Sequence, residues 1–296
     1  MEIYENVRIK QFLTEIESAL SESVKNKPPL IKSVLEAQEY SLLAGGKRIR
    51  PLLALLFCEA CGKDASKFAG VASSIEMIHS FSLIHDDLPC MDDDDYRRGV
   101  LSCHKKFGES TALLAGDALS FLAFETLVKE TERKVISCDV CTELTGVLSR
   151  AAGSFGMIGG QIIDLESEGK EIPLETLETL QDKKTGALIK AACVMGCILA
   201  GKKEKIELAE KYGGAVGLAF QIVDDILDVE GSFEELGKPI GSDAEQHKTT
   251  FVSLYGLEKS KALAKQLTND ALGHLKEFEA PDLLIELTKE LLTRKN

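Results

Sequence analysis

The sequence predicts an all-α protein of one domain. Nearly every segment of the 296 residues spaces its apolar side chains with a period near 3.6, as amphipathic helices do, and no segment alternates like a half-buried strand. Hydrophobic residues make up 44% of the chain, which is enough for a sizeable core. Because no low-complexity linker or repeat divides the chain, we expect a single domain over residues 1–296.

The helices of the first half are bounded by residues that break or cap helices. Pro28 and Pro29 interrupt the first helix, and Gly45 with Gly46 closes the second as a C-cap. The predicted helices of this half span residues 4–25, 32–44, 51–61 and 65–87.

The second half continues the helical period, with one irregular point and one long loop. Gly186 lies in the middle of a helical run, so we expect a kink with freed backbone carbonyls there. Residues 230–247 are rich in glycine and charge and are predicted to form a mobile surface loop, a candidate lid. The predicted helices of this half span 109–131, 134–156, 157–168, 173–200, 203–229, 249–277 and 281–294.

Charge and hydropathy exclude several classes of protein. The net charge of −13 argues against a nucleic-acid-binding surface. Residues 1–5 lack the basic and apolar regions of a signal peptide. The longest apolar run, 191–200, is much shorter than the roughly 18 residues of a membrane span and is predicted to be a buried helix. We therefore expect a soluble cytoplasmic protein without a membrane span.

Eight cysteines include two Cys-x-x-Cys pairs, Cys58/Cys61 and Cys138/Cys141. Zinc ribbons place such pairs about 15–20 residues apart, whereas these two pairs are much farther apart and lie in helical patterns. We expect free thiols that act as small core residues.

A first acidic cluster follows directly on helix 65–87. Asp86 and Asp87 lie at its C-terminal end, where the helix dipole already concentrates negative charge. Crowded carboxylates repel one another unless cations hold them, and Mg²⁺ typically bridges a few carboxylates to substrate phosphates. Arg97 and Arg98 come next and are suited to binding phosphate. A solvated acidic turn is the alternative interpretation.

A second acidic cluster makes the metal interpretation stronger. Asp224 and Asp228 are four residues apart and share one face of a helix, with Gln221 one turn earlier. In the first cluster, a straight helix would point Asp92 about 240° away from Asp86. Pro89 disrupts the helix between them, so Asp92 can return toward the same cation.

Three further groups of polar residues are candidates with two interpretations each. The basic loop 47–51 is either a diphosphate site or compensation for a helix dipole. His79 lies seven residues before Asp86 on nearly the same face, although a lone helical histidine is more often a core residue. Gln161 and Asp164 lie one turn apart and belong either to a buried polar network or to the site.

Taken together, these features indicate ionisation of a carbon–oxygen bond with diphosphate as the leaving group. Metal ions held between the two clusters and basic side chains would stabilise the departing charge. The carbocation that forms needs a dry apolar pocket, which a helix bundle can supply.

On these motifs the chain resembles the trans-isoprenyl diphosphate synthases, and within them the bacterial-type farnesyl diphosphate synthases. The resemblance covers about residues 35–255. It implies an orthogonal helix bundle of the isoprenoid synthase type, with about 10–13 helices around a central cavity. It also implies a homodimer. The motifs that carry it are Gly45-Gly46-Lys47-Arg48-Ile49-Arg50-Pro51, Asp86-Asp87-x4-Asp92 with Arg97-Arg98-Gly99, Gly160-Gln161-x-x-Asp164, Lys184-Thr185-Gly186, Phe220-Gln221-x-x-Asp224-Asp225-x-x-Asp228 and Gly237-Lys238-Pro239.

The resemblance implies a head-to-tail condensation of isopentenyl diphosphate with dimethylallyl or geranyl diphosphate, and it gives roles to individual residues. Asp86, Asp92 and Asp224 would coordinate about three Mg²⁺ ions, for which Mn²⁺ can substitute. The allylic diphosphate would be held by Arg97, Lys184, Lys238 and Lys248. Isopentenyl diphosphate would be held by Lys47, Arg50, His79 and Arg98. Thr185 and Gln221 would line the cation, and Gln161 would be a substrate-site residue.

Phe81 is the candidate for setting product length. On an ideal helix it points about 140° away from Asp86, so periodicity alone does not place it in the pocket. In the family, an aromatic residue at this position resembles the farnesyl-producing members. We therefore expect farnesyl diphosphate as the product, with geranylgeranyl diphosphate as the alternative.

Two other enzyme classes and one non-catalytic role compete with this interpretation. An HD-type phosphohydrolase would use the pair His85-Asp86, but it needs further histidine ligands that the sequence does not offer at a second cluster. A class I terpene cyclase shares the first aspartate motif, but its second motif is usually of another type. A regulatory subunit is the third alternative, although such relatives commonly lose an aspartate cluster and this chain keeps both.

Overall fold

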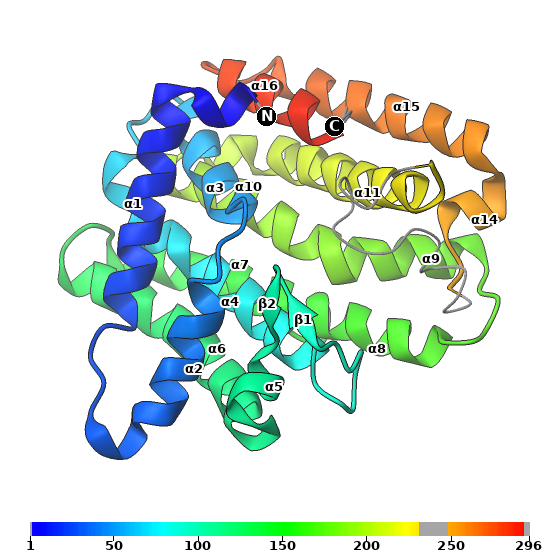
Figure 1. Cartoon of the computed structure of the whole chain (residues 1–296). Coiled ribbons are helices and arrows are strands. Elements are labelled where there is room, and N and C mark those ends of the chain that lie inside the picture. The colour runs from blue at the N-terminus through cyan, green and yellow to red at the C-terminus, as the bar shows by residue number, and fades with distance from the viewer. Residues whose placement is uncertain (1, 231–247, 293–296) are drawn as a thin grey trace.

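The computed structural model describes residues 2–230 and 248–292 and confirms the all-α class (Figure 1). The expected surface loop 230–247, with Lys238, lies outside the described residues except at its first residue. The helices of the first half are η1 (Glu2–Glu5), α1 (Val7–Ser23), η2 (Pro29–Ile31), α2 (Lys32–Leu42), α3 (Ile49–Ala60), η3 (Ser66–Phe68), α4 (Ala69–Asp86), α5 (Cys103–Phe107) and α6 (Glu109–Glu132).

The second half is also helical. Its elements are α7 (Cys138–Ala152), α8 (Met157–Ser167), α9 (Leu174–Gln181), η4 (Asp182–Gly186), α10 (Ala187–Ala200), η5 (Lys203–Lys205), α11 (Ile206–Glu230), α14 (Phe251–Tyr255), α15 (Leu257–Leu275) and α16 (Asp282–Leu292).

The core is built around α10, which packs against α3, α7 and α11. Every residue of α10 from Leu188 to Leu199 is buried except Lys190. Gly196 allows α3 to approach closely, because a Cβ there would lie 2.5 Å from the carbonyl oxygen of Ala54. Figure 1 shows α15 and α16 along one side of the molecule with α11 next to them.

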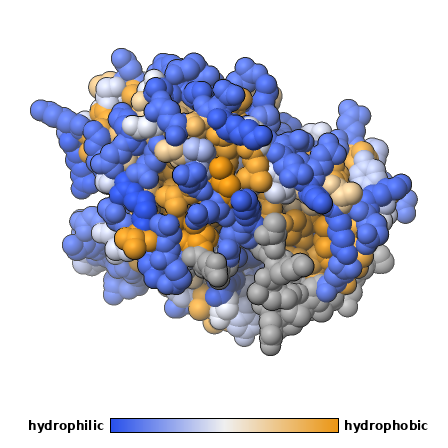
Figure 2. Space-filling view, turned by 90° about the horizontal axis from the view of Figure 1, so that it is seen from above, coloured by the Kyte–Doolittle hydropathy of each residue, from blue (hydrophilic) through white to orange (hydrophobic). Residues whose placement is uncertain are grey.

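The surface is mostly hydrophilic in the view of Figure 2. Hydrophilic side chains cover most of the face in Figure 2, and hydrophobic side chains reach the surface in patches between them.

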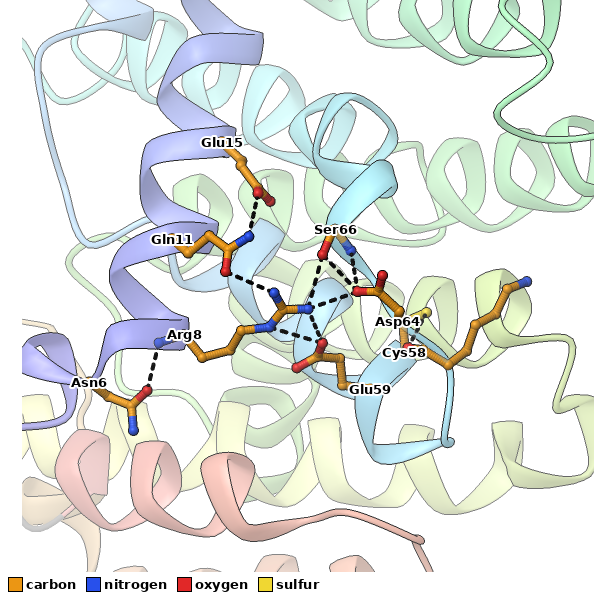
Figure 3. Close-up of polar contacts among 9 residues, drawn as sticks. Asn6, Arg8, Gln11, Glu15, Cys58, Glu59, Asp64 and Ser66 are labelled. Atoms are coloured by element: carbon orange, nitrogen blue, oxygen red, sulfur yellow. Dashed lines mark hydrogen bonds and ion pairs between the residues drawn. The ribbon is translucent and has the colours of Figure 1, made fainter.

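An arginine network fastens α1 to the start of the bundle (Figure 3). Arg8 donates from Nε to Glu59 at 3.0 Å and from its terminal nitrogens to Asp64 at 2.9 Å, Ser66 at 3.1 Å and Gln11 at 2.9 Å. These partners come from α1 itself, from α3 and from the turn before α4. Exposed ion pairs contribute little singly, but a shared arginine fixes the position of several elements.

Two of the sequence-based expectations about secondary structure are wrong. A short antiparallel hairpin, β1 (Tyr96–Arg97) and β2 (Val100–Leu101), interrupts the helices, although no strand was expected. Its two turn residues, Arg98 and Gly99, have φ of 53° and 78°, as tight hairpin turns require. The single helix expected over 249–277 is divided at Gly256, whose φ of 76° only glycine adopts easily.

The boundaries of two other helical segments also have local causes. α7 begins at Cys138 rather than residue 134, because the Ser137 hydroxyl caps it by accepting the Val140 N–H at 3.3 Å. The irregular point expected at Gly186 is present as a π-helical turn, Asp182–Gly186, between α9 and α10.

The cysteines are only partly as expected. Cys58 and Cys61 are buried and free, so they are small core residues. Cys138 and Cys141 are also free, and the partly buried Cys141 packs against the core. Cys138 is exposed, so the expected core position is wrong for this residue.

α6 combines a buried face with an apolar outer face. By length and composition alone it is apolar enough to cross a membrane, with a mean hydropathy of 1.5, and it is the one such helix among the described residues. Its inner residues, which include Ala115 and Leu119, are fully buried, and the helix packs against α4. Leu114, Phe121 and Val128 recur every seven residues on the other side and are 58%, 75% and 51% exposed.

Candidate active site

The end of α4 opens into a cavity of about 490 Å³ that gathers many of the predicted residues. Its walls come from α3, α4, α6, α8 and the π-helical turn, and they are mainly apolar, as is typical of ligand pockets. The predicted site residues in its lining are Arg50, His79, Phe81, Asp86, Gln161, Lys184 and Thr185.

A second cavity, of about 200 Å³, lies between α8, α9 and α11. Its lining is predominantly polar and includes Gln221, Asp224 and Lys248 from the predicted site. Lys184 lines both cavities and so lies between the two acidic clusters. The structure therefore brings the two groups of motif residues to adjoining spaces.

The first acidic cluster folds back on itself after α4. The Asp92 N–H donates to the Asp86 carbonyl oxygen at 2.9 Å, so the chain returns toward the helix end as the break at Pro89 predicted. Burial raises the pKa of the Asp86 carboxyl to about 6, Asp92 and Asp87 add to this, and Lys184 opposes it. Burial is thus the main reason why the pKa of this carboxyl is raised, and the neighbouring carboxylates contribute less.

Two close helix contacts hold Lys184 at this position. A Cβ on Gly160 of α8 would lie 2.6 Å from the Lys184 Cα, and one on Gly217 of α11 would lie 2.9 Å from the Gly186 Cα. Glycine at both places lets α8 and α11 close on the π-helical turn. The Lys184 ammonium pairs with Asp164 of α8, which lines the second cavity.

Arg50 and His79 line the first cavity, and Arg98 acts electrostatically on both; we call these three residues the basic wall. Arg50, in the first turn of α3, has an Nε without a hydrogen-bond partner in the described structure. Burial lowers the pKa of Arg50, and the neighbouring Arg98 lowers it further. Burial and then the charges of Arg50 and Arg98 hold the pKa of His79 well below its ordinary 6.5. A neutral imidazole beside an arginine whose Nε has no partner is suited to receive an anion.

Other predicted residues occupy the borders of these spaces. Lys47 is exposed in the loop before α3. Arg98 donates to the Gly45 carbonyl oxygen. Arg97 is held by Asp87 and by Asp94, the latter at 2.8 Å, so it would have to exchange partners to bind a diphosphate.

Gln161 and Phe81 face the first cavity from opposite walls. The Gln161 Nε2 is buried and has no partner in the described structure, which favours the site interpretation over a closed polar network. Phe81 is 8% exposed and lines the same cavity as Asp86, although an ideal helix does not require it.

Sequence reasoning missed the residues that support the basic wall. Arg48 and Glu76 are almost fully buried and form an ion pair at 2.9 Å. A signal was present, since Glu76 is a lone carboxylate within the apolar run of helix α4.

The acidic residues fit a metal that arrives with a phosphorylated ligand. Within residues 2–230 and 248–292, no three carboxylate, imidazole or thiol groups are close enough to hold an ion by themselves. Mg²⁺ commonly takes only one or two protein carboxylates and completes its shell with water and substrate phosphate oxygens. The half-buried Asp86, with acidic neighbours close by, fits a metal site in which the protein supplies only some of the ligands.

Known proteins share this sequence and fold. The model of the polyprenyl synthetase family matches residues 31–291. A farnesyl diphosphate synthase of Micrococcus luteus is 49% identical over 255 residues, which are 86% of this chain and 85% of that protein. A heterodimeric geranylgeranyl pyrophosphate synthase large subunit of Arabidopsis thaliana is 43% identical over 287 residues, 95% of this chain and 77% of that protein.

The fold agrees with this relationship. The crystal structure of an FPP/GFPP synthase from Zymomonas mobilis superposes with a TM-score of 0.86 and 37% identity, covering 99% of this chain and all of that one. The all-helical bundle, the two adjoining cavities with their aspartate motifs and the match over 31–291 lead to one conclusion: the chain is a prenyltransferase of the polyprenyl synthetase family.

Proposed function

We propose that the enzyme condenses isopentenyl diphosphate head to tail with dimethylallyl and then geranyl diphosphate to make farnesyl diphosphate. The observation that carries the proposal is the position of Lys184, which lines both the cavity with Asp86 and the cavity with Asp224. A diphosphate between the two clusters would lie beside this ammonium group, with the apolar cavity below it for the hydrocarbon.

The reaction breaks the bond between the allylic carbon and its diphosphate oxygen. The double bond of isopentenyl diphosphate then attacks the allylic cation, a carbon–carbon bond forms, and the proton lost from the adduct goes to the released diphosphate. Lys184 and Lys248 would stabilise the leaving group, and the mainly apolar lining of the first cavity would keep water from the cation.

The metal set is part of the proposal. Asp86, Asp92 and Asp224 would hold about three Mg²⁺ ions together with the allylic diphosphate, with Mn²⁺ as a substitute. When bound, these ions supply charge neutralisation for the leaving diphosphate.

The diphosphates of the two substrates would be bound by different groups of basic residues. The basic wall, with Lys47 at its border, would bind isopentenyl diphosphate, because the Arg50 Nε lacks a partner. Lys184, Lys248 and Arg97 would bind the allylic diphosphate, as would Lys238 outside the described residues. Thr185 and Gln221 would line the cation.

Geranylgeranyl diphosphate is the second candidate product. The names of relatives support each product, since a farnesyl and a geranylgeranyl synthase resemble the chain with 49% and 43% identity. Phe81 in the cavity wall favours the shorter chain, because its ring limits depth.

The phosphohydrolase alternative has a structural counterargument. His85 donates from Nε2 to the Leu113 carbonyl oxygen at 3.0 Å, so its ring is engaged with α6 instead of sharing a ligand position with Asp86. Neither this alternative nor a terpene cyclase accounts for the basic wall around Arg50.

The test is an incubation of the purified protein with Mg²⁺, isopentenyl diphosphate and dimethylallyl diphosphate, followed by dephosphorylation and chromatography. We expect farnesol. Geranylgeraniol would favour the second candidate, and the absence of any condensation product would overturn the proposal. A reaction with geranyl diphosphate alone would test the cyclase and hydrolase alternatives.

We also propose that the enzyme is a cytoplasmic homodimer that meets its copy through the outer face of α6. The row of Leu114, Phe121 and Val128 is too apolar and exposed for a face that remains in water. Analytical ultracentrifugation should show a dimer for the native chain and a monomer for Phe121→Glu. Phe155→Glu, at an exposed phenylalanine outside α6, is the matched control.

A further inference from the structure

Glu76 on α4 is the buried carboxylate at which the arginines of the basic wall converge. It is 2% exposed. Arg48 donates to its Oε1 at 2.9 Å, and the Arg98 Nη2 lies 3.8 Å from the same oxygen. Glu76 also acts electrostatically on Arg50. A buried carboxylate is tolerated only with such partners, so one glutamate serves three arginines.

All three nitrogens of the Arg48 guanidinium group donate to the protein, and the buried side chain faces none of the cavity walls described above. Its Nε donates to Glu17 at 2.6 Å, Nη1 donates to Glu76, and Nη2 donates to the Leu42 carbonyl oxygen at 2.8 Å. Its side chain is 1% exposed. Arg48 therefore ties α1, α2 and α4 to the start of α3.

Arg50 and Arg98, by contrast, keep donors available. The Arg50 Nε is buried without a partner in the described structure. Arg98 donates to the Gly45 carbonyl oxygen and reaches Glu76 only at ion-pair distance. Burial lowers the pKa of both arginines despite the attraction of Glu76. The basic wall thus holds more positive charge than its single buried carboxylate balances.

The backbone of the loop before α3 explains how the ion pair of Arg48 and Glu76 can position both Arg50 and Arg98. Arg48 has a left-handed φ of 50° directly before α3, so its side chain turns inward, while Arg50 in the first turn of α3 lines the cavity. Gly46 has a φ of 117°, and a Cβ there would lie 2.8 Å from the Arg98 guanidinium carbon. Arg98 therefore rests on the loop that Arg48 anchors.

We propose that Glu76 and Arg48 form a positioning pair that holds Arg50 and Arg98 for the diphosphate of isopentenyl diphosphate. This inference rests on the proposed function. Neither member of the pair touches the substrate. Glu76 fixes the loop through Arg48 and limits the repulsion between the free guanidinium groups, which would otherwise spread apart until an anion binds.

The experiment separates positioning from simple structural support. Calorimetric titration of isopentenyl diphosphate into the protein gives Kd, and steady-state kinetics give KM for each substrate. Glu76→Gln removes the charge at nearly constant shape and should raise Kd and KM for isopentenyl diphosphate by roughly tenfold or more. KM for the allylic substrate should stay within about twofold, because Glu76 has no contact with that cavity.

Three further variants sharpen the result. Arg48→Met should act in the same direction, and the double variant should be no worse than the stronger single one, since the two residues act as a unit. Glu76→Asp keeps the charge and should recover part of the affinity. Glu130→Gln is the control, because Glu130 is another buried glutamate that pairs with Arg133 on α6, away from the cavities.

The outcomes are distinct. Unchanged affinity for isopentenyl diphosphate in Glu76→Gln, with only a lower melting temperature, would overturn the positioning role. Equal losses for both substrates would overturn it as well. If Glu76→Gln does not fold, Arg48→Met decides, since an unchanged Kd in that variant contradicts the proposal. Native protein that binds isopentenyl diphosphate without condensing it would refute the proposed function, while the Kd comparison would still test the positioning pair.

Discussion

The rings of Phe81 and His85 meet edge to face one helical turn apart on α4, with centroids 5.6 Å apart and planes inclined by 75°. His85 donates to the Leu113 carbonyl oxygen of α6 at 3.0 Å, and its ring lies against Gly116, where a Cβ would overlap it. We call the side chains that would limit the depth of the hydrocarbon cavity its floor. This floor is therefore a pair of rings supported from α6, so the depth of the cavity depends on His85 and Gly116 as well as on Phe81.

Phe81→Ala should deepen the cavity and lengthen the product. The mutation removes a ring that lines the cavity and contacts His85. Products of twenty carbons or more should therefore form at the expense of the fifteen-carbon product. The new space should also lower the free energy of unfolding by about 3–5 kcal/mol if it does not collapse. Chromatography of dephosphorylated products and thermal unfolding measure both effects.

Phe278→Ala is the matched control for this change. Phe278 is 6% exposed, close to the 8% of Phe81, but it packs on Phe57 away from the cavities. It should destabilise the protein without changing product length. A product distribution of Phe81→Ala that equals that of the native chain would show that Phe81 is not the floor.

Gly116→Ala should have the opposite effect on product length. The added methyl group must displace the His85 ring, and α6 cannot retreat because its neighbouring residues Ala115 and Leu119 are fully buried. The ring therefore moves toward the cavity, and the share of ten-carbon product should rise. Gly146→Ala on α7 is the control, since a Cβ there meets only the flexible end of Arg150 at 3.7 Å. Longer products from Gly116→Ala would contradict this account.

The sequence predicted most of the helices well, because helix periodicity is a local pattern. Periodicity located the run that ends at Asp86, and proline chemistry anticipated the return of Asp92. The hairpin around Arg98 was missed because four strand residues are too few for any period to show. The break at Gly256 was missed because a glycine inside a helical pattern is often tolerated.

The parts that escaped prediction depend on contacts between distant segments. The support of His85 by Gly116 joins α4 to α6, and nothing local in either helix indicates it. The pairing of Arg48 with Glu76 is similar, since it follows from how α3 packs on α4. Helix periodicity specifies which face is buried but not which neighbour covers it.

The two aspartate clusters should be equally necessary for turnover. Asp86→Ala or Asp224→Ala should each lower kcat by several orders of magnitude, because each removes a carboxylate from the proposed metal set. Circular dichroism should show the fold intact. Asp164→Ala is the comparison, because Asp164 pairs with Lys184 and is not in the proposed metal set. This mutation should lower kcat less than the loss of a metal-binding aspartate does. Near-native turnover of either cluster variant would exclude the assignment.

Kinetics should separate the two diphosphate sites. Arg50→Ala should mainly raise KM for isopentenyl diphosphate, because Arg50 lies on the basic wall of the first cavity. Lys248→Ala, on the second cavity with Asp224, should mainly raise KM for the allylic substrate, and Lys238→Ala should do the same. Each rise should be roughly tenfold or more, as for other charged contacts to a substrate. The reverse pattern would mean that the two sites are exchanged.

His79 should make the folded protein sensitive to mild acid. Burial and the surrounding charges of Arg50, Arg98, Arg48 and Arg97 hold the pKa of His79 well below 6.5. The unfolded chain therefore takes up this proton at a higher pH than the folded chain, so the stability associated with a neutral His79 is lost as the pH falls below about 6.5. Carboxyl groups also titrate in this pH range. The contribution of His79 must therefore be measured as the difference between the native chain and a variant without this histidine.

His79→Gln removes the titration but keeps a neutral side chain that can hydrogen-bond. We expect the melting temperature of this variant to rise relative to that of the native chain as the pH is lowered from about 7.5 to about 5. Because the same imidazole belongs to the proposed isopentenyl diphosphate site, saturating isopentenyl diphosphate should reduce the difference: a bound anion offsets the four arginine charges and makes protonation of His79 less costly. A difference in melting temperature that stays constant over this pH range would show that His79 takes up its proton equally well in the folded and unfolded chain.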